Sequence, residues 1–384
     1  MGSIGPTKHQ PTAEQELDFE DLPPFPDDVP TVPLLRLNLK SIQEGNLEEI
    51  ERLWKACCEF GFFYLDLRGK EGEEEEEGDA LLKSADELFQ LADRVFELPV
   101  EEKQKYDFVE QGSYFGYKGY GKGVVDQEGL LKAPLPNPPI LQKAETRAKL
   151  KTYILHSHAL VTLLLHRLND KLGLPPETLP NIHRLDNPSG DQVRWVRSPP
   201  QPPGDRAAAL GGHTDFGSVT ILFNRLGGLQ VLLPHPQQEI WAYVKPLRGH
   251  CVVNLGDAMV KFTRGILRSN LHRVVNPPGE QGGEVRLSLV YFNRPGDEVL
   301  LRGLEGSAMI EEAKERQGDG EEEGITAKQW ILNRAMGRRV GRDWKMGEGT
   351  DRESRPQYLD VPTKRREASQ SGTALTAPAD HSHA

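Results

Sequence analysis

Hydrophobic residues in the first half of the chain recur at helical spacing in three segments. The first segment follows Asn46, which lies three residues before Glu49 in an arrangement typical of a helix N-terminus. The second covers about residues 79–97 and ends before Pro99, because proline disfavours helical geometry in the residue that precedes it. The third and longest covers about residues 144–172. Each segment predicts an amphipathic helix.

Strands are predicted by a different spacing. Residues 32–37 and 61–66 flank the first helix, and the second of these runs is rich in aromatic residues. From about residue 192 the pattern changes to short strands separated by glycine and proline, which is typical of a sandwich or jelly roll. We expect these strands near residues 192–197, 209–213, 218–223, 229–232, 241–245, 251–254, 271–275 and 285–293. The predicted fold class is therefore α+β, with a double-stranded β-helix (jelly-roll) core supported by N-terminal and central α-helices.

The same patterns divide the chain into five regions. The two ends are rich in polar residues and proline, which predicts disorder. A closing helix is expected at about 326–331, after a polar linker at 311–324. In order, the regions are a disordered arm at 1–30, an N-terminal region of helices and strands at 31–185, the jelly-roll core at 186–300, a C-terminal helical closure at 301–362 and a disordered tail at 363–384.

Composition limits the partners of the protein. The 384 residues carry a formal net charge of −11, which argues against nucleic acid because phosphate contacts need clustered lysine and arginine. No apolar run approaches the about 18 residues of a membrane span, and the N-terminus lacks the pattern of a secretory signal. Only three cysteines occur, which favours reduced thiols. We expect a cytoplasmic protein without a membrane partner, and we favour a monomer.

Three residues in the second half of the chain predict a metal site. His213 and Asp215 are separated by one residue, so on an extended strand both side chains fall on the same face and can point at one ion. His272 comes from a second predicted strand. Two imidazoles and one carboxylate on one side of a metal are diagnostic of non-haem Fe(II) oxygenases. Zinc is the chemical alternative, since the same donors suit a hydrolytic zinc centre.

Arg286 and Ser288 predict an anion site. They alternate onto one face of an otherwise apolar strand, and a guanidinium with a hydroxyl is suited to hold a carboxylate by charge-assisted hydrogen bonds. Burying an arginine without an anionic partner would be costly. The zinc interpretation gives no account of this pair. Asn254, which lies between Asp215 and His272 in the sequence, is assigned to a turn before the metal-bearing sheet edge, with a structural role.

Five sequence fragments are weak signals singly but specific in their order. They are Gly212-His213-Thr214-Asp215-Phe216-Gly217-Ser218, Gly227-Gly228-Leu229-Gln230-Val231, Val253-Asn254-Leu255-Gly256-Asp257, Leu267-Arg268-Ser269-Asn270-Leu271-His272-Arg273-Val274 and Arg286-Leu287-Ser288-Leu289-Val290-Tyr291-Phe292. In these fragments the chain resembles the isopenicillin N synthase-like branch of the Fe(II)/2-oxoglutarate-dependent dioxygenases, in particular its fungal members.

The resemblance implies an oxidoreductase that uses Fe(II), 2-oxoglutarate and O2 to oxidise a small organic molecule. By the resemblance, His213, Asp215 and His272 are the catalytic iron ligands, and Arg286 and Ser288 hold the distal carboxylate of 2-oxoglutarate. Oxidative decarboxylation then yields succinate and CO2. Hydroxylation is the default outcome, and desaturation or ring closure needs only a different substrate pose. A role in secondary metabolism is expected by analogy with fungal relatives.

A loop of aromatic residues and glycines is expected over the pocket. Its sequence does not fit a phosphate-binding loop, because it lacks the Gly-Lys-Ser/Thr ending and no strand directly precedes it. In the family the corresponding region borders the substrate. Candidates for substrate contact are therefore Tyr114, Phe115, Tyr117 and Tyr120, together with Phe292.

One stretch departs from the family pattern. Family members commonly carry a tyrosine ahead of a Pro-Pro pair, and that tyrosine also reaches the cosubstrate carboxylate. Here Val196, Arg197 and Ser198 occupy these positions. Arg197 either supplies a second positive charge to 2-oxoglutarate or faces outward, and the sequence leaves both open. Two other functions also remain open: an Fe(II)/O2 oxidase of the same fold that does not use 2-oxoglutarate, and a zinc-dependent hydrolase.

Overall fold

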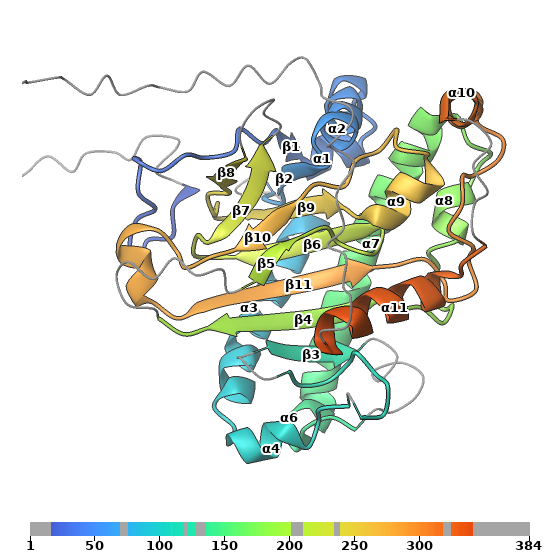
Figure 1. The fold of residues 1–384 in the computed structure, drawn as a ribbon. Coiled ribbons are helices and arrows are strands. Elements are labelled where there is room, and N and C mark those ends of the chain that lie inside the picture. The colour runs from blue at the N-terminus through green and yellow to red at the C-terminus, as the bar shows by residue number, and fades with distance from the viewer. Residues whose placement is uncertain are drawn as a thin grey trace, which may run out of the picture.

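The computed structural model shows two β-sheets and a set of helices that cover one of them (Figure 1). Most strand pairs are antiparallel, so the predicted α+β jelly-roll class is confirmed. Tyr120 lies outside the described residues. The structure describes residues 17–69, 76–108, 110–118, 122–126, 136–200, 210–233, 239–317 and 324–340.

The larger sheet has the strand order β1-β2-β9-β6-β11-β4-β3 and the smaller one β5-β10-β7-β8. The strands are β1 (Arg36–Asn38), β2 (Phe62–Asp66), β3 (Lys122–Asp126), β4 (Gln192–Ser198), β5 (Leu210–His213), β6 (Val219–Asn224), β7 (Leu229–Leu233), β8 (Ile240–Tyr243), β9 (His250–Leu255), β10 (His272–Val274) and β11 (Arg286–Asn293). All eight strands expected after residue 192 are present. Strands β1, β2 and β3 come from the N-terminal region, so this region contributes directly to the larger sheet.

The three long helices α2, α3 and α7 begin and end close to the predicted residues, whereas the closing helix continues beyond residue 331 to Val340. Asn46 caps the first long helix by accepting a hydrogen bond from the Glu49 backbone N–H at 3.0 Å. The longest helix ends at Gly173, whose φ of 66° lies in the left-handed region that glycine adopts readily. The helices are α1 (Leu39–Gln43), α2 (Leu47–Glu59), α3 (Glu77–Phe96), α4 (Val100–Gln104), α6 (Pro139–Gln142), α7 (Ala144–Leu172), α8 (Thr178–Asn181), α9 (Asp257–Phe262), α10 (Ala308–Gln317) and α11 (Ala327–Val340), with a 3-10 turn at Gly279–Gly283.

Three expectations differ from the structure. The first strand begins at Arg36 rather than at residue 32. Half of the predicted polar linker forms α10, which buries Ile310 and Ala313 although half of its residues are charged. In the predicted N-terminal arm, Phe25 is buried and packs edge-on against Tyr243 at 6.1 Å between ring centroids. The last two differences arise from a few apolar contacts between residues that are distant in sequence, which local composition does not reveal.

The larger sheet separates a hydrophobic core from a cavity. Helices α3 and α7 pack on one face, where β11 directs Leu289 and Tyr291. The alternate residues of the same strand, Arg286 and Ser288, point to the opposite face. The smaller sheet lies over that opposite face, so the two sheets form the walls of a cavity (Figure 1).

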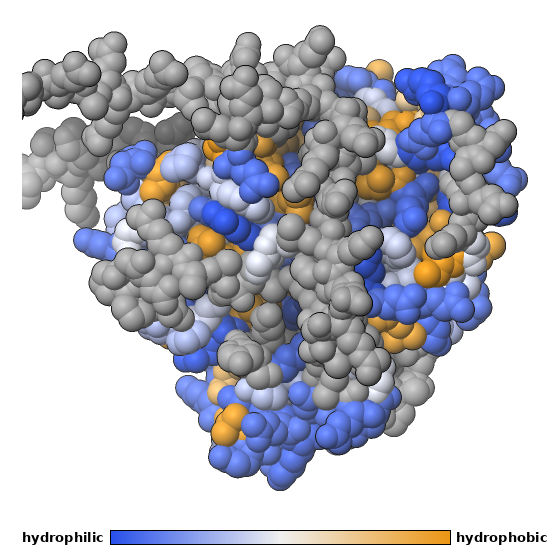
Figure 2. Space-filling model, in the orientation of Figure 1, coloured by the Kyte–Doolittle hydropathy of each residue, from blue (hydrophilic) through white to orange (hydrophobic). Residues whose placement is uncertain are grey.

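The outer helices have a polar surface. No residue of α4 is buried, and the described residues around α4 and α10 are mainly hydrophilic on the face seen in Figure 2. Among the described helices, none is long and apolar enough to cross a membrane.

Candidate active site

His213, Asp215 and His272 converge at one point in the cavity. The two histidines lie directly opposite each other on the paired strands β5 and β10, with ring centroids 4.2 Å apart. The Asp215 Oδ1 atom lies 4.0 Å from the Nε2 atom of His213 and 3.8 Å from that of His272. One ligand atom from each residue lies within 4.8 Å of the others, and all three residues are buried. This donor set can hold a metal ion on one face and leave the other face open.

Backbone carbonyls orient the two histidines. The Nδ1 of His213 donates to the Gly211 carbonyl at 3.0 Å, and the Nδ1 of His272 donates to the Asn270 carbonyl at 3.2 Å. Because a carbonyl only accepts, each Nδ1 carries the proton and each Nε2 directs its lone pair toward Asp215. The ring of Phe62, from β2, packs edge-on against His272 at 5.3 Å. The imidazoles therefore have the tautomer that metal binding requires.

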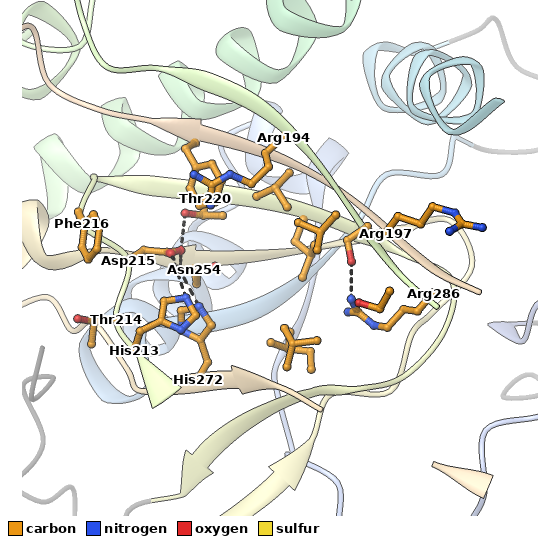
Figure 3. A pocket seen from close by; sticks show the side chains of 18 of the residues that line it. Arg194, Arg197, His213, Thr214, Asp215, Phe216, Thr220, Asn254, His272 and Arg286 are labelled. Carbon is orange, nitrogen blue, oxygen red and sulfur yellow. Dashed lines mark hydrogen bonds and ion pairs between the residues drawn. The ribbon is translucent and has the colours of Figure 1, made fainter. Parts of the chain in front are cut away.

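The two oxygens of the Asp215 carboxylate make different contacts. Its Oδ2 atom accepts hydrogen bonds from Thr220 Oγ1 and Asn254 Nδ2, each at 2.7 Å, which leaves Oδ1 facing the histidines (Figure 3). Burial would raise the pKa of Asp215, but the positive charge that His272 carries when protonated, together with these hydrogen bonds, outweighs burial and lowers it. The carboxylate is thus held ionised, as a metal ligand must be.

Two sequence interpretations of this region need correction. Asp215 lies two residues beyond the end of β5 rather than on the same regular strand as His213. Its direction is fixed by its backbone, whose carbonyl accepts from the Asp257 N–H at 2.8 Å. Asn254 lies on β9 and binds Asp215, so the turn assigned to it is wrong. The contact joins residues 39 positions apart, which explains why local sequence gave no signal.

Arg286 and Ser288 form the predicted pair. The Nη1 of Arg286 donates to Ser288 Oγ at 2.7 Å and its Nε donates to the Gly227 carbonyl at 2.6 Å. Burial lowers the pKa of Arg286 to about 10, and no carboxylate in the described part of the chain offsets that effect. Gly228 has a φ of 105°, and a Cβ there would lie 3.1 Å from Arg286 Nε. The close approach of the Gly227-Gly228 backbone to the Arg286 side chain accounts for the Gly-Gly motif.

A cavity of about 550 Å³ contains both groups. Apolar side chains line much of the wall between the metal triad and Arg286 (Figure 3). They include Leu222, Leu229, Val274 and Val290. The cavity can hold a small dicarboxylate between the triad and the arginine, with room for an organic molecule beside it.

The aromatic candidates divide into two groups. Tyr117 and Phe292 line the cavity, as expected. Tyr114 and Phe115 do not line it. Instead they are buried against Ile331 of α11, and their rings lie 4.3 Å apart. A direct substrate contact by these two residues is therefore not supported, because their rings are used to pack the C-terminal helix.

The register places Arg197 on the other face of its strand from the anion pair. Arg286 is opposite Ser198, whereas Arg197 is opposite Leu287, and facing residues of antiparallel strands share one side. Figure 3 shows the Arg197 side chain directed away from Arg286. Arg197 still borders the cavity near Lys103 of α4, and burial, together with the positive charge of Arg197, lowers the pKa of that lysine.

Sequence reasoning missed two further arginines of the cavity wall. Arg194 lies on β4 on the same face as Arg286 and Ser288, and Arg294 follows β11. The available signal for Arg194 was its position between the apolar residues Val193 and Trp195 on a predicted strand. Nothing in the local sequence distinguishes Arg294.

Comparison with known proteins identifies the family. Residues 190–295 match the family model of the 2OG-Fe(II) oxygenase superfamily, and residues 29–137 match that of the N-terminal part of non-haem dioxygenases in morphine synthesis. Over 326 residues the chain is 30% identical to a 2-oxoglutarate-dependent dioxygenase of Aspergillus fumigatus, covering 75% of this chain and 83% of that protein. The chain belongs to the 2OG-Fe(II) oxygenase superfamily. A 2-oxoglutarate-dependent dioxygenase of Glarea lozoyensis is 28% identical over 289 residues, which cover 71% of this chain and 83% of the relative.

Solved structures of this superfamily share the fold. Full-length Neurospora crassa T7H in complex with alpha-KG has a TM-score of 0.63 at 21% identity and aligns over 81% of this chain and 97% of its own. JOX2 in complex with 2OG, Fe and JA has a TM-score of 0.54 at 22% identity, over 76% of this chain and 81% of its own. The protein is a 2-oxoglutarate-dependent dioxygenase that uses Fe(II), 2-oxoglutarate and O2 on a small molecule.

Proposed function

We propose that His213, Asp215 and His272 hold the Fe(II) ion and that Arg286, helped by Ser288, holds the distal carboxylate of 2-oxoglutarate. The observation that carries this proposal is the placement of the three metal donors in one cavity with a buried arginine that has no acidic partner among the described residues. When bound, the iron couples decarboxylation of 2-oxoglutarate to oxidation of a C–H bond. The chain's own residues orient the two reactants.

The donor set fits this assignment. Both histidines present Nε2, and Asp215 presents an ionised oxygen, without any rearrangement of their hydrogen bonds. Arg286 is already fixed by the Gly227 carbonyl, so little side-chain entropy is lost when it binds an anion. The apolar wall between these groups excludes water from the cosubstrate.

We further propose hydroxylation of a small organic molecule as the reaction, with desaturation or ring closure as variants of the same chemistry. Fungal relatives named as 2-oxoglutarate-dependent dioxygenases support a fungal, isopenicillin N synthase-like enzyme of secondary metabolism. The three cysteines form no disulfide bond, which is compatible with a cytoplasmic location; they are Cys57, Cys58 and Cys251. A monomer remains our prediction for the oligomeric state.

The test uses purified full-length protein loaded with Fe(II) without O2. We expect one iron per chain and succinate formation from 2-oxoglutarate once O2 is admitted. The His213→Ala variant should lose both, because two ligands cannot retain the ion at ordinary affinity. Iron binding measured by metal analysis is the primary result, since turnover without substrate can be slow.

Two results would contradict the proposal. Equal iron content in the wild type and His213→Ala would remove the metal assignment. Iron binding with no affinity for 2-oxoglutarate would favour the Fe(II)/O2 oxidase, in which Arg286 holds the carboxylate of the substrate itself.

A further inference from the structure

The cavity wall carries more positive charge than the iron and 2-oxoglutarate require. Asp215 is the one acidic side chain in the described lining. In the proposed function, the two charges of Fe(II) are balanced by Asp215 and one carboxylate of 2-oxoglutarate, and Arg286 balances the other carboxylate. Beyond Arg286, the lining holds four further cationic side chains: Lys103, Arg194, Arg197 and Arg294. Their positive charge calls for a further anion, because cationic groups in a low-dielectric cavity repel one another.

Two of these cations enclose one aromatic ring. The Arg194 guanidinium lies 4.8 Å from the Phe292 ring centroid, and that of Arg294 lies 5.6 Å from it. Both arginines line the cavity together with Phe292. Lys103 differs, because its Nζ donates to the Phe96 carbonyl at 2.6 Å. The pair around Phe292 is therefore the better-built site for an anion.

Arg294 is buried with part of its hydrogen-bonding capacity unused. It is 4% exposed, and its Nη1 donates to the Gly190 carbonyl and, at 3.4 Å, to the Tyr114 hydroxyl. Its Nε is buried and has no hydrogen-bond partner among the described residues. Asp191 is the nearby carboxylate, but it accepts from the Arg294 backbone N–H rather than from the guanidinium. A buried donor of this kind lowers the stability of the fold unless a ligand accepts a hydrogen bond from it.

Arg194 is held next to the metal triad. Its Nη2 donates to Gln192 Oε1 at 2.5 Å, and its side chain lines the same cavity as Asp215. Figure 3 shows it beside Thr220, whose hydroxyl binds Asp215, while Arg286 lies farther along the cavity. A substrate anion at Arg194 would therefore place its body beside the open face of the iron site.

Resting on the proposed function, we infer that the primary substrate is an aromatic carboxylic acid whose carboxylate binds Arg194 and Arg294. The fork of a guanidinium matches a carboxylate. Phe292, Phe216 and Phe62 line the cavity and offer apolar contacts to a planar body. A singly charged carboxylate suits the pair better than a phosphate dianion, because Asp191 already offsets part of the Arg294 charge.

The experiment measures binding by calorimetry to full-length protein saturated with Fe(II) and 2-oxoglutarate in the absence of O2, so that Arg286 is already occupied. The probes are benzoate, phenylacetate, cinnamate and 2-naphthoate, each compared with its uncharged primary amide and with phenyl phosphate. We expect at least one acid to bind at least about tenfold more tightly than its amide, which corresponds to one charge-assisted hydrogen bond.

Variants assign the preference to a residue. Arg194→Gln should weaken binding of the acid by about 10-fold to 100-fold and leave the amide unchanged, whereas Arg194→Lys should retain a preference for the acid. The control is Arg225→Gln, because Arg225 also stacks on a phenylalanine, Phe89 at 4.5 Å, but pairs with Asp86 at the surface. An unchanged 2-oxoglutarate affinity shows that each variant is folded.

The outcomes separate this inference from the proposed function. If the protein binds iron and 2-oxoglutarate but binds acids and amides equally, or binds no acid at about 1 mM, the inference is wrong and the proposed function stands. A preference for phenyl phosphate, or an Arg194→Gln variant that keeps the full affinity for acids, also overturns the inference. Failure to bind iron or 2-oxoglutarate would instead overturn the proposed function.

Discussion

The two sides of the metal triad are built differently. On the metal side, the atoms that do not face the ion are satisfied by the chain itself: Gly211 and Asn270 orient the histidines, and Thr220 with Asn254 binds Asp215. On the Phe292 side, Arg294 retains a buried donor, its Nε, that has no partner in the described part of the chain. The difference shows which part of the site has a complete hydrogen-bond network before any ligand binds and which part depends on a ligand to complete it. A complete network suits the shared chemistry, and an incomplete one suits selection of a substrate.

The largest effect in this comparison is expected at the cosubstrate end. Arg286→Met removes the cation and leaves a side chain of similar length, so 2-oxoglutarate should bind about 100-fold more weakly to the Fe(II)-loaded protein without O2. Calorimetric titration with 2-oxoglutarate checks this. The matched control Arg225→Met should bind normally, since Arg225 lies at the surface. Unchanged affinity in Arg286→Met would place the cosubstrate carboxylate elsewhere.

Sequence predicted the parts of this site that are determined locally. His213, His272, Arg286 and Ser288 lie on strands, where alternation and residue chemistry can be interpreted over a few positions. Asp215 was singled out by its chemistry, although it lies beyond the end of β5. The eight strands after residue 192 were found for the same reason, with differences of one or two residues at their ends.

The rest depends on contacts between distant segments. Asn254 reaches Asp215 only because β9 lies beside β6 in the larger sheet. Tyr114 and Phe115 have the composition of a substrate loop, but α11 packs against them and removes them from the cavity. Arg294 gains its role from burial near Gly190 and Tyr114. None of these neighbours is encoded by spacing along the chain.

A smaller effect tests whether the metal side depends on its supporting hydrogen bonds. Asn254→Leu removes one of the two donors to Asp215 Oδ2, so iron affinity should fall by about tenfold, at the lower end of the range for residues that orient metal ligands. Competition with a chelator measures it. The control Asn169→Leu removes a buried amide of α7, which bonds Pro175 and Leu179. It should lower thermal stability but leave iron affinity unchanged, and an equal loss of iron in both variants would contradict a specific role for Asn254.

The smallest expected effect concerns how the free energy of unfolding depends on pH. One titrating group lies behind each side of the triad. Behind the metal loop, His183 is bonded to Ser218 Oγ at 2.6 Å, and burial lowers the pKa of His183 to about 4. Behind Arg294, burial raises the pKa of Asp191 to about 6. As pH falls below 6.5, the unfolded chain protonates its histidine first, so His183 reduces stability down to about pH 4. Asp191 has the opposite sign, since the cost of its buried charge is fully present above about pH 6 and is relieved as pH falls toward 3.8.

Between pH 7 and pH 5.5, each group should change the free energy of unfolding by about 1 kcal/mol, with opposite signs. The wild type should therefore show a small net change, because the two contributions offset each other. His183→Gln should become relatively more stable as pH falls, and Asp191→Asn relatively less stable. Urea unfolding of the three proteins at both pH values measures these differences. If the free energy of unfolding changed equally with pH in the wild type and in His183→Gln, the pKa of His183 would be the same in the folded and unfolded chains. The metal loop would then be more open to water than its burial indicates.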